Sequence, residues 1–253
     1  MYPELFRIGN FTISSYGVMV AVAFLAAYWL SSLEFKRRGL DEKLLGNFLI
    51  AAMVGGIVGA KILYLLENVP FSEFMRNPIH YLLARGGLTY LGGLLGAALL
   101  MWFIAHWNKM SFWTLGDAVA PGLAVAYTIA RIGCFLVGDD YGIPSDLPWA
   151  IAFPKGLPPT TERVHPTQIY EIILMGAVFI YLWKVRKKTV PTGWLFSIFL
   201  ILAGLERFLI EFVRATTPSP IPHLSLAQLM SIGMIIVGVI KLIQIRELKS
   251  TEK

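Results

Sequence analysis

Seven apolar runs dominate this sequence, and each is long enough to cross a lipid bilayer. A transmembrane helix needs about 20 predominantly apolar residues to span a hydrocarbon core about 30 Å thick. Hydrophobic residues make up 56% of the chain and charged residues only 15%, which excludes an ordinary soluble domain. The sequence therefore predicts an all-α integral membrane protein with about seven transmembrane helices. We place them at residues 17–34, 44–66, 88–106, 112–136, 168–184, 192–213 and 225–243.

The basic residues predict which way these helices run. If the N-terminus lies outside, the cytoplasmic segments hold 13 of the 22 lysines and arginines and the outer segments hold 6. Cytoplasmic loops carry an excess of Lys and Arg, so we expect the N-terminus outside and the C-terminus in the cytoplasm. The net charge of +6 then reflects topology and attraction to the anionic lipid bilayer, and not binding of nucleic acid.

The longest connection covers residues 137–166. It is rich in proline yet keeps Trp149, Ile151 and Phe153. Loops of this length are functional or disordered, and these apolar side chains argue against disorder. We expect a small outer, periplasmic cap within a single membrane domain of residues 1–253.

Small residues recur at the spacing of close helix contacts. Gly55 and Gly59 form one G-x-x-x-G motif, and Gly92 and Gly96 form another. Such motifs let two transmembrane helices approach backbone to backbone. The alternative is that the glycines leave room for a lipid chain or headgroup.

Arginines at membrane depth need an explanation, because a charge at the centre of a transmembrane helix costs about 2.5–3.5 kcal/mol. Arg131 lies in the fourth run, and Arg207, Glu211 and Arg214 follow one helical stripe in the sixth. One interpretation is mutual neutralisation, of Arg207 by Glu211 and of Arg131 by an acid on a neighbouring helix. The other is recognition of phosphate, which the planar guanidinium binds with two parallel hydrogen bonds. Two arginines near the outer ends of their runs favour a phospholipid headgroup site in the outer leaflet.

The stretch HPTQIYE, residues 165–171, brings polar chemistry to the start of the fifth run. Pro166 suits the first helical turn, flanked by His165 or Thr167 as a cap. Gln168 and Glu171 lie one turn apart, so polar groups converge on one rim. A histidine here is either a hydrogen-bonding residue or a chemical group.

Signatures of other chemistries are missing from the sequence. It contains no G-x-S-x-G elbow, no H-E-x-x-H, no Walker loop and no dinucleotide fingerprint. A single cysteine, Cys134, excludes an intrachain disulfide and a cysteine metal cluster.

Taken together, these motifs resemble the prolipoprotein diacylglyceryl transferase family. The resemblance runs in order over nearly the whole chain, from Ser14 to Arg214, and is carried by HPTQIYE, ARIGCFLVGDDYG, RGGLTYLGG and GLERFLIEFVR. The resemblance implies a multi-pass enzyme of the bacterial cytoplasmic (inner) membrane, with seven transmembrane helices and an active site toward the periplasm. Such an enzyme moves the diacylglyceryl group of phosphatidylglycerol onto the lipobox cysteine thiol in the signal peptide of a preprolipoprotein. It forms a thioether, releases glycerol phosphate and needs no metal or organic cofactor.

The resemblance also implies roles for individual residues. Arg131 and Arg207 match the two essential arginines of the family, and Tyr16 and His165 are further catalytic candidates. Lys61 stands where an arginine is usual. The implied substrate-binding residues are Arg131, Lys61, Asp117, Gly142, Gln168, Tyr170, Glu171, Glu211 and Arg214.

Three positions depart from the family pattern. Leu91 replaces a histidine that is the usual candidate base, Ala203 replaces a tyrosine, and Cys134 stands where asparagine is frequent. Tyr16, His165 or arginine-promoted thiolate formation would then activate the thiol. The alternatives are a paralogous transferase with another acceptor and a non-enzymatic phospholipid transporter or receptor.

Overall fold

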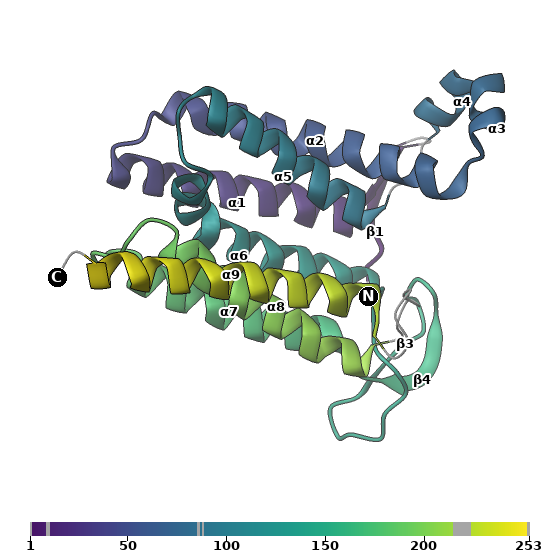
Figure 1. Cartoon of the computed structure of the whole chain (residues 1–253). Coiled ribbons are helices and arrows are strands. Elements are labelled where there is room, and N and C mark those ends of the chain that lie inside the picture. The colour runs from purple at the N-terminus through teal and green to yellow at the C-terminus, as the bar shows by residue number, and fades with distance from the viewer. Residues whose placement is uncertain (1, 9–10, 85–86, 88, 215–223, 252–253) are drawn as a thin grey trace. The chain divides into compact units, whose positions relative to one another are not determined.

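The computed structural model describes residues 2–8, 11–84, 87, 89–214 and 224–251, and it is mostly helical (Figure 1). Contacts divide the chain into two compact units, one of residues 1–34 and 116–253 and one of residues 35–115. The single membrane domain expected from the sequence stays a prediction. Arg85, Gly86 and Leu88 of the RGGLTYLGG motif lie outside the described residues.

Each predicted apolar run coincides with a helix. Within the described residues, five of these helices are long and apolar enough to cross a membrane, namely α1, α2, α6, α7 and α9. Helices α5 and α8 are shorter, so the count of seven spans and the orientation of the termini stay predictions. The helices are α1 (Ser15–Arg38), α2 (Glu42–Asn68), α5 (Tyr90–Trp107), α6 (Phe112–Val137), α7 (Thr167–Val185), α8 (Trp194–Ile210) and α9 (Leu226–Thr251).

Short elements that the apolar pattern does not predict lie between these helices. Strands β1 (Glu4–Ile8) and β2 (Phe11–Ser14) form one antiparallel hairpin, and β3 (Ile151–Phe153) pairs with β4 (Thr160–Val164) in another. Helices α3 (Phe71–Arg76) and α4 (Pro78–Leu83) follow α2. They are too short to give a hydropathy signal.

The core of the first unit lies between α6, α7 and α8, and α9 packs along α8 (Figure 1). Asp117, near the start of α6, accepts hydrogen bonds from the backbone N–H groups of Gly193 and Phe196, both at 2.8 Å. The first N–H groups of a helix lack partners within the helix, so this carboxylate fixes where α8 begins. The buried apolar cluster is Ala120, Ala124, Met175, Leu182, Val185, Leu195, Phe199 and Ala203.

A buried ion pair joins α1 to the end of α7. Glu34 pairs with Nη1 of Arg186, and the guanidinium of Arg186 lies 3.4 Å above the ring of Trp183. Both charged side chains are shielded from solvent, so each compensates the burial of the other.

The second unit depends on a close contact between α2 and α5. A Cβ added to Gly59 would lie 2.3 Å from the carbonyl oxygen of Gly92, and one added to Gly96 would lie 2.2 Å from that of Gly55. The two helices therefore touch backbone to backbone. This confirms the predicted G-x-x-x-G contact.

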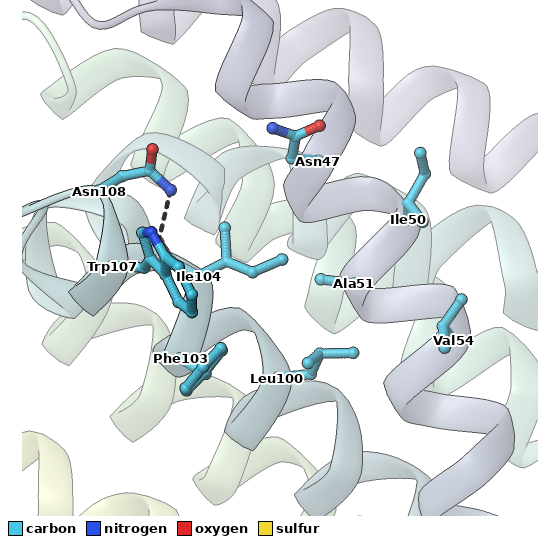
Figure 2. Close-up of a pocket in the computed structure, with 9 residues that line it drawn as sticks. All are labelled: Asn47, Ile50, Ala51, Val54, Leu100, Phe103, Ile104, Trp107 and Asn108. Atoms are coloured by element: carbon cyan, nitrogen blue, oxygen red, sulfur yellow. Dashed lines mark hydrogen bonds between the residues drawn. The ribbon is translucent and has the colours of Figure 1, made fainter.

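A groove of about 380 Å³ lies on the second unit between α2 and α5 (Figure 2). Its walls are apolar, and its polar side chains are Asn47 and Asn108, whose amide donates to the carbonyl of Ile104 at 2.8 Å. None of the nine lining residues carries a charge, an imidazole or a thiol. The groove therefore offers no group for acid–base or nucleophilic chemistry.

The segment of residues 137–166 has internal order around the β3–β4 hairpin. Phe153 is buried, and its ring stacks on Tyr141 with the centroids 5.3 Å apart. The guanidinium of Arg163 donates to three backbone carbonyls between residues 147 and 150. Trp149, in contrast, is 56% exposed, so it does not belong to this small core.

We expect Gly59→Ala to destabilise the protein, because its Cβ meets a backbone carbonyl that cannot move aside easily. Overpacking of this kind costs about 1–3 kcal/mol, which lowers the melting temperature by about 2–10 °C. Gly46→Ala, on the same helix, is the control, since its Cβ meets nothing within 4 Å. Equal melting temperatures for the two variants, measured in detergent, would contradict the contact.

Candidate functional site

Glu171 lies at the centre of the candidate site, in the second turn of α7, and its side chain is fully buried. Its Oε2 atom is 2.9 Å from Nε of Arg131 on α6. Its Oε1 atom accepts a hydrogen bond from the hydroxyl of Tyr127 at 3.1 Å. The guanidinium of Arg131 also lies 5.2 Å from the centroid of the Tyr127 ring. This ion pair therefore joins α6 and α7 inside the first unit.

Two further arginines reach Glu171 from the end of α8. Nη1 of Arg207 is 3.7 Å from Oε1 of Glu171, and Nη1 of Arg214 is 3.6 Å from the same oxygen. Nη2 of Arg207 pairs with Oε2 of Glu211 at 2.7 Å. The predicted pairs, Arg207 with Glu211 and Arg131 with an acid on a neighbouring helix, are confirmed.

The prediction that Arg214 continues the helical stripe of α8 is wrong. Helix α8 ends at Ile210, a 3₁₀ turn covers Glu211–Val213, and Arg214 has extended backbone. Arg214 pairs with Gly142 in an isolated antiparallel bridge, and its Nη2 lies 2.8 Å from Oδ1 of Asp140. The helix stops because this segment pairs with another part of the chain, which helical spacing cannot reveal.

A tight turn after α6 brings the carboxylate of Asp140 to Arg131 and Arg214. Its Oδ2 atom is 2.9 Å from Nη1 of Arg131, and its backbone adopts the left-handed φ of 59° that aspartate tolerates. The hydroxyl of Thr167 donates to the Asp140 carbonyl at 2.7 Å, and the amide of Gln168 donates to the carbonyl of Asp139. The HPTQIYE motif thus holds the backbone of this turn.

The side chains beside Pro166 do not cap α7, contrary to the prediction. Pro166 occupies the cap position without a side-chain hydrogen bond, and α7 begins at Thr167. The hydroxyl of Thr167 is used on the turn, and the ring of His165 contacts Tyr170 with Nδ1 3.3 Å from the hydroxyl. Thr167 therefore makes a tertiary contact, and His165 makes a local contact with a later residue of the same motif.

Gly142 lies between His165 and Arg214. Its N–H donates to the carbonyl of His165 at 2.9 Å, and a Cβ at this position would lie 2.2 Å from the carbonyl oxygen of Val213 and 2.8 Å from Cβ of His165. Only glycine fits here without displacing backbone. The close approach brings His165 next to the arginine cluster.

The two neighbouring aspartates differ in their electrostatic surroundings. Burial raises the pKa of the Asp140 carboxyl, but Arg214 and then Arg131 lower it by more, so this pKa lies below its ordinary value. Burial, aided by the charge of Asp140, raises the pKa of the Asp139 carboxyl. Asp140 is therefore the ionised partner of the arginines.

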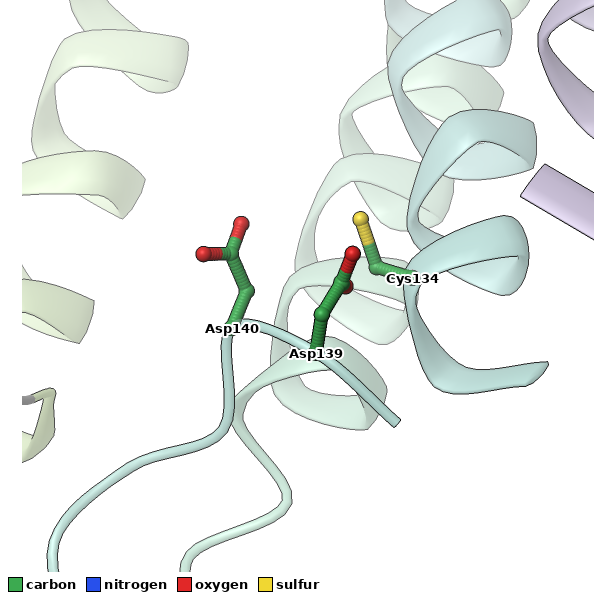
Figure 3. Close-up of side chains that lie close together, drawn as sticks. All are labelled: Cys134, Asp139 and Asp140. Atoms are coloured by element: carbon green, nitrogen blue, oxygen red, sulfur yellow. The ribbon is translucent and has the colours of Figure 1, made fainter. Parts of the chain in front are cut away.

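Cys134, Asp139 and Asp140 bring a thiol and two carboxylates within 4.8 Å of one another (Figure 3). Nη1 of Arg131 is 2.9 Å from Asp140 and 3.6 Å from Sγ of Cys134. The guanidinium of Arg131 thus already contacts both Asp140 and Cys134. These side chains suit a guanidinium better than a metal ion.

Several buried polar atoms of the site lack a hydrogen-bond partner among the described residues. They include Nη1 of Arg207, Nη1 of Arg214 and Oε1 of Gln168. Glu206, a further buried acid on α8, has no such partner for Oε1, and nothing in the structure explains its presence. Buried polar groups are normally satisfied. The two guanidinium nitrogens lie at ion-pair distance from Oε1 of Glu171 but beyond hydrogen-bond distance, so each still has a hydrogen bond to donate.

Two other residues implied by the family resemblance make contacts of a different kind. Asp117 precedes Arg131 by 14 residues on α6, which is about 21 Å along a helix, and it caps α8. Lys61 belongs to the second unit, where its ammonium donates to the carbonyl of Ala84 at 2.9 Å. Substrate binding by either residue stays a prediction.

Tyr16 on α1 lies beside the C-terminal half of α6. A Cβ added to Gly133 would be 3.4 Å from Cδ2 of Tyr16, so the two helices touch within two residues of Arg131. The ring is 44% exposed. Its catalytic role stays a prediction.

The sequence does not predict the site contacts of Tyr127 and Asp140, and it predicts Thr167 only as a possible helix cap. Tyr127 lies one helical turn before Arg131, a spacing that could have suggested contact. Asp140 follows the same helix in the acidic pair of GDDYG, which is a visible signal beside a membrane arginine. Nothing in the local sequence indicates that Thr167 would bond a carbonyl 27 residues away.

Buried arginines and carboxylates, contributed by three helices of a multi-pass helical membrane protein, define the class of this chain. Comparison with known sequences gives the family. The sequence profile of the family described as Prolipoprotein diacylglyceryl transferase matches residues 3–244. The chain belongs to this family, which confirms the resemblance.

Similar proteins carry the name phosphatidylglycerol--prolipoprotein diacylglyceryl transferase. The protein from Clostridium tetani is 32% identical over 240 residues, covering 94% of this chain and 96% of its own length. That from Aeromonas salmonicida is 34% identical over 243 residues, covering 93% and 87%. That from Vibrio parahaemolyticus is 33% identical over 249 residues, covering 95% and 89%.

The three departures from the family pattern have different surroundings. Ala203 belongs to the apolar core between α6, α7 and α8. Cys134 is buried, with its sulfur near the guanidinium of Arg131. Leu91 lies at the start of α5 in the second unit. Cys134 is thus the departure that directly contacts the arginine cluster.

We expect Glu171→Gln to lower stability, because it removes the buried charge that three guanidiniums approach. Breaking a buried ion pair from one side costs about 3–5 kcal/mol. Glu162→Gln, at an exposed position of β4, is the control. A melting temperature for Glu171→Gln equal to that of the control would show that the arginines do not depend on this carboxylate.

We expect Asp117→Ala to lower stability by about 0.5–2 kcal/mol, as loss of a helix cap does, and to leave the KM for lipid unchanged. Asp41→Ala removes the exposed cap of α2 and serves as the control. Thermal unfolding and steady-state kinetics check both effects. A raised KM at unchanged stability would instead favour the substrate-binding role.

Proposed function

We propose that this protein transfers the diacylglyceryl group of phosphatidylglycerol to the lipobox cysteine thiol of a preprolipoprotein signal peptide. Membership of the family and the names of its relatives support this function. The structural observation that carries it is a pair of buried guanidinium nitrogens, Nη1 of Arg207 and Nη1 of Arg214, which lie 3.7 and 3.6 Å from Oε1 of Glu171 and have no acceptor within hydrogen-bond distance among the described residues.

Unsatisfied buried donors explain why a phosphate would bind here. Leaving such a group without its hydrogen bond costs about 1–3 kcal/mol, and a headgroup phosphate supplies the missing acceptors. Arginine–phosphate hydrogen bonds are short, strong and often paired. Arg207 and Arg214 would hold the phosphate, with Arg131 beside them.

The reaction is a displacement at carbon. The thiol sulfur forms a bond to the glycerol carbon, the bond from that carbon to a phosphate oxygen breaks, and the electron pair stays on the oxygen. The thiol proton leaves to water, so the products are a thioether and glycerol phosphate. The guanidiniums stabilise the charge that develops on the leaving phosphate, and Glu171, Asp140 and Glu211 fix their positions beforehand.

We infer that the site faces the outer leaflet of the bacterial inner membrane. Arg131 and Arg207 lie near the C-terminal ends of α6 and α8, and Glu171 lies near the N-terminal end of α7. Consecutive spanning helices run in opposite directions, so these three ends share one side of the bilayer. The basic residues put that side outside, with seven spans and the N-terminus outside.

The test uses purified protein, phosphatidylglycerol vesicles and a lipobox peptide, with mass spectrometry to detect diacylglyceryl added at cysteine. We expect a thioether product that is absent with the cysteine-to-alanine peptide. Arg131→Ala should lower kcat by about 10²-fold or more, as loss of one transition-state donor does. Arg246→Ala, an exposed arginine on α9, is the control and should keep full activity.

Leu91, in place of the family histidine, favours one second candidate, a paralogous transferase with another acceptor. If the folded protein consumes phosphatidylglycerol without modifying the peptide, while an active relative assayed in parallel modifies it, then the acceptor is not the lipobox cysteine. If phospholipid moves between vesicles without any covalent product, then the protein is a transporter and not an enzyme. Full activity of Arg131→Ala would overturn the arginine site.

A further inference from the structure

Three side chains of the first unit, two of them from the HPTQIYE motif, form a short series of hydrogen bonds. Nε1 of Trp149 donates to the hydroxyl of Tyr170 at 2.7 Å. The same hydroxyl lies 3.3 Å from Nδ1 of His165. Trp149 belongs to the cap segment, Tyr170 to α7, and His165 opens the HPTQIYE motif.

The chemistry of these groups indicates which of them donates each hydrogen bond and which accepts it. An indole N–H is only a donor, so the Tyr170 oxygen accepts from Trp149. The phenolic proton of Tyr170 is then available to donate, and the nitrogen in contact with it is Nδ1 of His165, which accepts when it carries no proton. If Nδ1 accepts, a neutral imidazole carries its proton on Nε2.

We propose that Trp149 and Tyr170 are positioning residues that hold neutral His165 in its Nε2–H tautomer, so that His165 presents a hydrogen-bond donor to the phosphate and not a base to the thiol. The part that concerns phosphate rests on the proposed function. The part that concerns the tautomer depends only on the hydrogen-bond chain.

The position of His165 suits a donor to an anion held by arginines. Gly142 accommodates both neighbours, since it pairs with Arg214 and donates to the carbonyl of His165. A Cβ at position 142 would lie 2.8 Å from Cβ of His165. Gly142 therefore lies between the backbones of His165 and Arg214, so an Nε2–H of His165 that turns toward this side adds to the donors around the same site.

This arrangement concerns the group that takes the thiol proton, since Leu91 replaces the usual candidate base of the family. In the Nε2–H tautomer, Nδ1 is occupied by Tyr170 and Nε2 has no free lone pair. His165 therefore cannot accept the thiol proton, which must leave by another group or by water. Its Nε2–H bond instead hydrogen-bonds the phosphate oxygen that receives the electron pair of the broken C–O bond.

The tautomer is tested directly by NMR of protein labelled with ¹⁵N in histidine. The chain has four histidines, so few signals compete, and His165→Gln identifies the signal that disappears. We expect the Nε2–H pattern for His165 in wild type, and its weakening in both Tyr170→Phe and Trp149→Phe. Tyr181→Phe, on the same helix and 43% exposed, is the control and should leave the pattern unchanged. An Nδ1–H pattern in wild type overturns the proposal.

Kinetics of two amide variants test the consequence for the reaction. The amide nitrogen of glutamine reaches about as far as Nε2, and that of asparagine only about as far as Nδ1. We expect His165→Gln to keep kcat/KM within about tenfold of wild type and to exceed His165→Asn clearly, because a donor is restored. A general base contributes about 10²–10⁴-fold, so a loss of that size in both variants would identify a base and overturn the proposal.

The proposed tautomer of His165 and the proposed transferase function can be refuted separately. An Nε2–H tautomer in a protein without transferase activity supports the hydrogen-bond chain and overturns the proposed function. Transferase activity with an Nδ1–H tautomer supports the proposed function and overturns the role of Trp149 and Tyr170.

Discussion

Glu171 is a fully buried carboxylate, and a buried charge is tolerated only when it is paired. That constraint organises the first unit. Arg131 on α6 forms an ion pair with Glu171, and so do Arg207 near the end of α8 and Arg214 just after that helix. These ion pairs fix α6, α7 and α8 relative to one another at one end. Mutual neutralisation and phosphate recognition are therefore compatible. The carboxylate holds the guanidiniums in place, and the nitrogens that it does not satisfy are left for a ligand.

The sequence predicts those parts of the structure that depend on local chemistry. Apolar runs identify helices because backbone groups in a bilayer must be satisfied within the segment, and each predicted run coincides with a helix. The Arg207–Glu211 pair follows from helical spacing alone. Contacts between distant segments are different: the bridge between Arg214 and Gly142 ends α8 early, and the hydroxyl of Thr167 bonds the turn after α6 instead of its own helix. No periodic pattern contains that information.

Residues at family positions do not all serve the same purpose. Asp117 lies far from the arginine cluster, and its two hydrogen bonds start α8 at the residue that brings Arg207 and Glu211 to the other end of the helix. Gly142 carries no functional group, yet it permits the approach of His165 to Arg214. Both residues affect the site through the backbone, and a motif match alone cannot separate such roles from direct contact with substrate.

The arginine cluster also determines how an anion would enter. Three guanidiniums face three carboxylates, Asp140, Glu171 and Glu211, so the cluster is close to electroneutral before any ligand arrives. A lipid phosphate then adds acceptors to cations that are already paired and aligned. Long-range attraction contributes little to this step, and ionic strength should affect it only weakly. Recognition would depend on the geometry of hydrogen-bond donors and not on net charge.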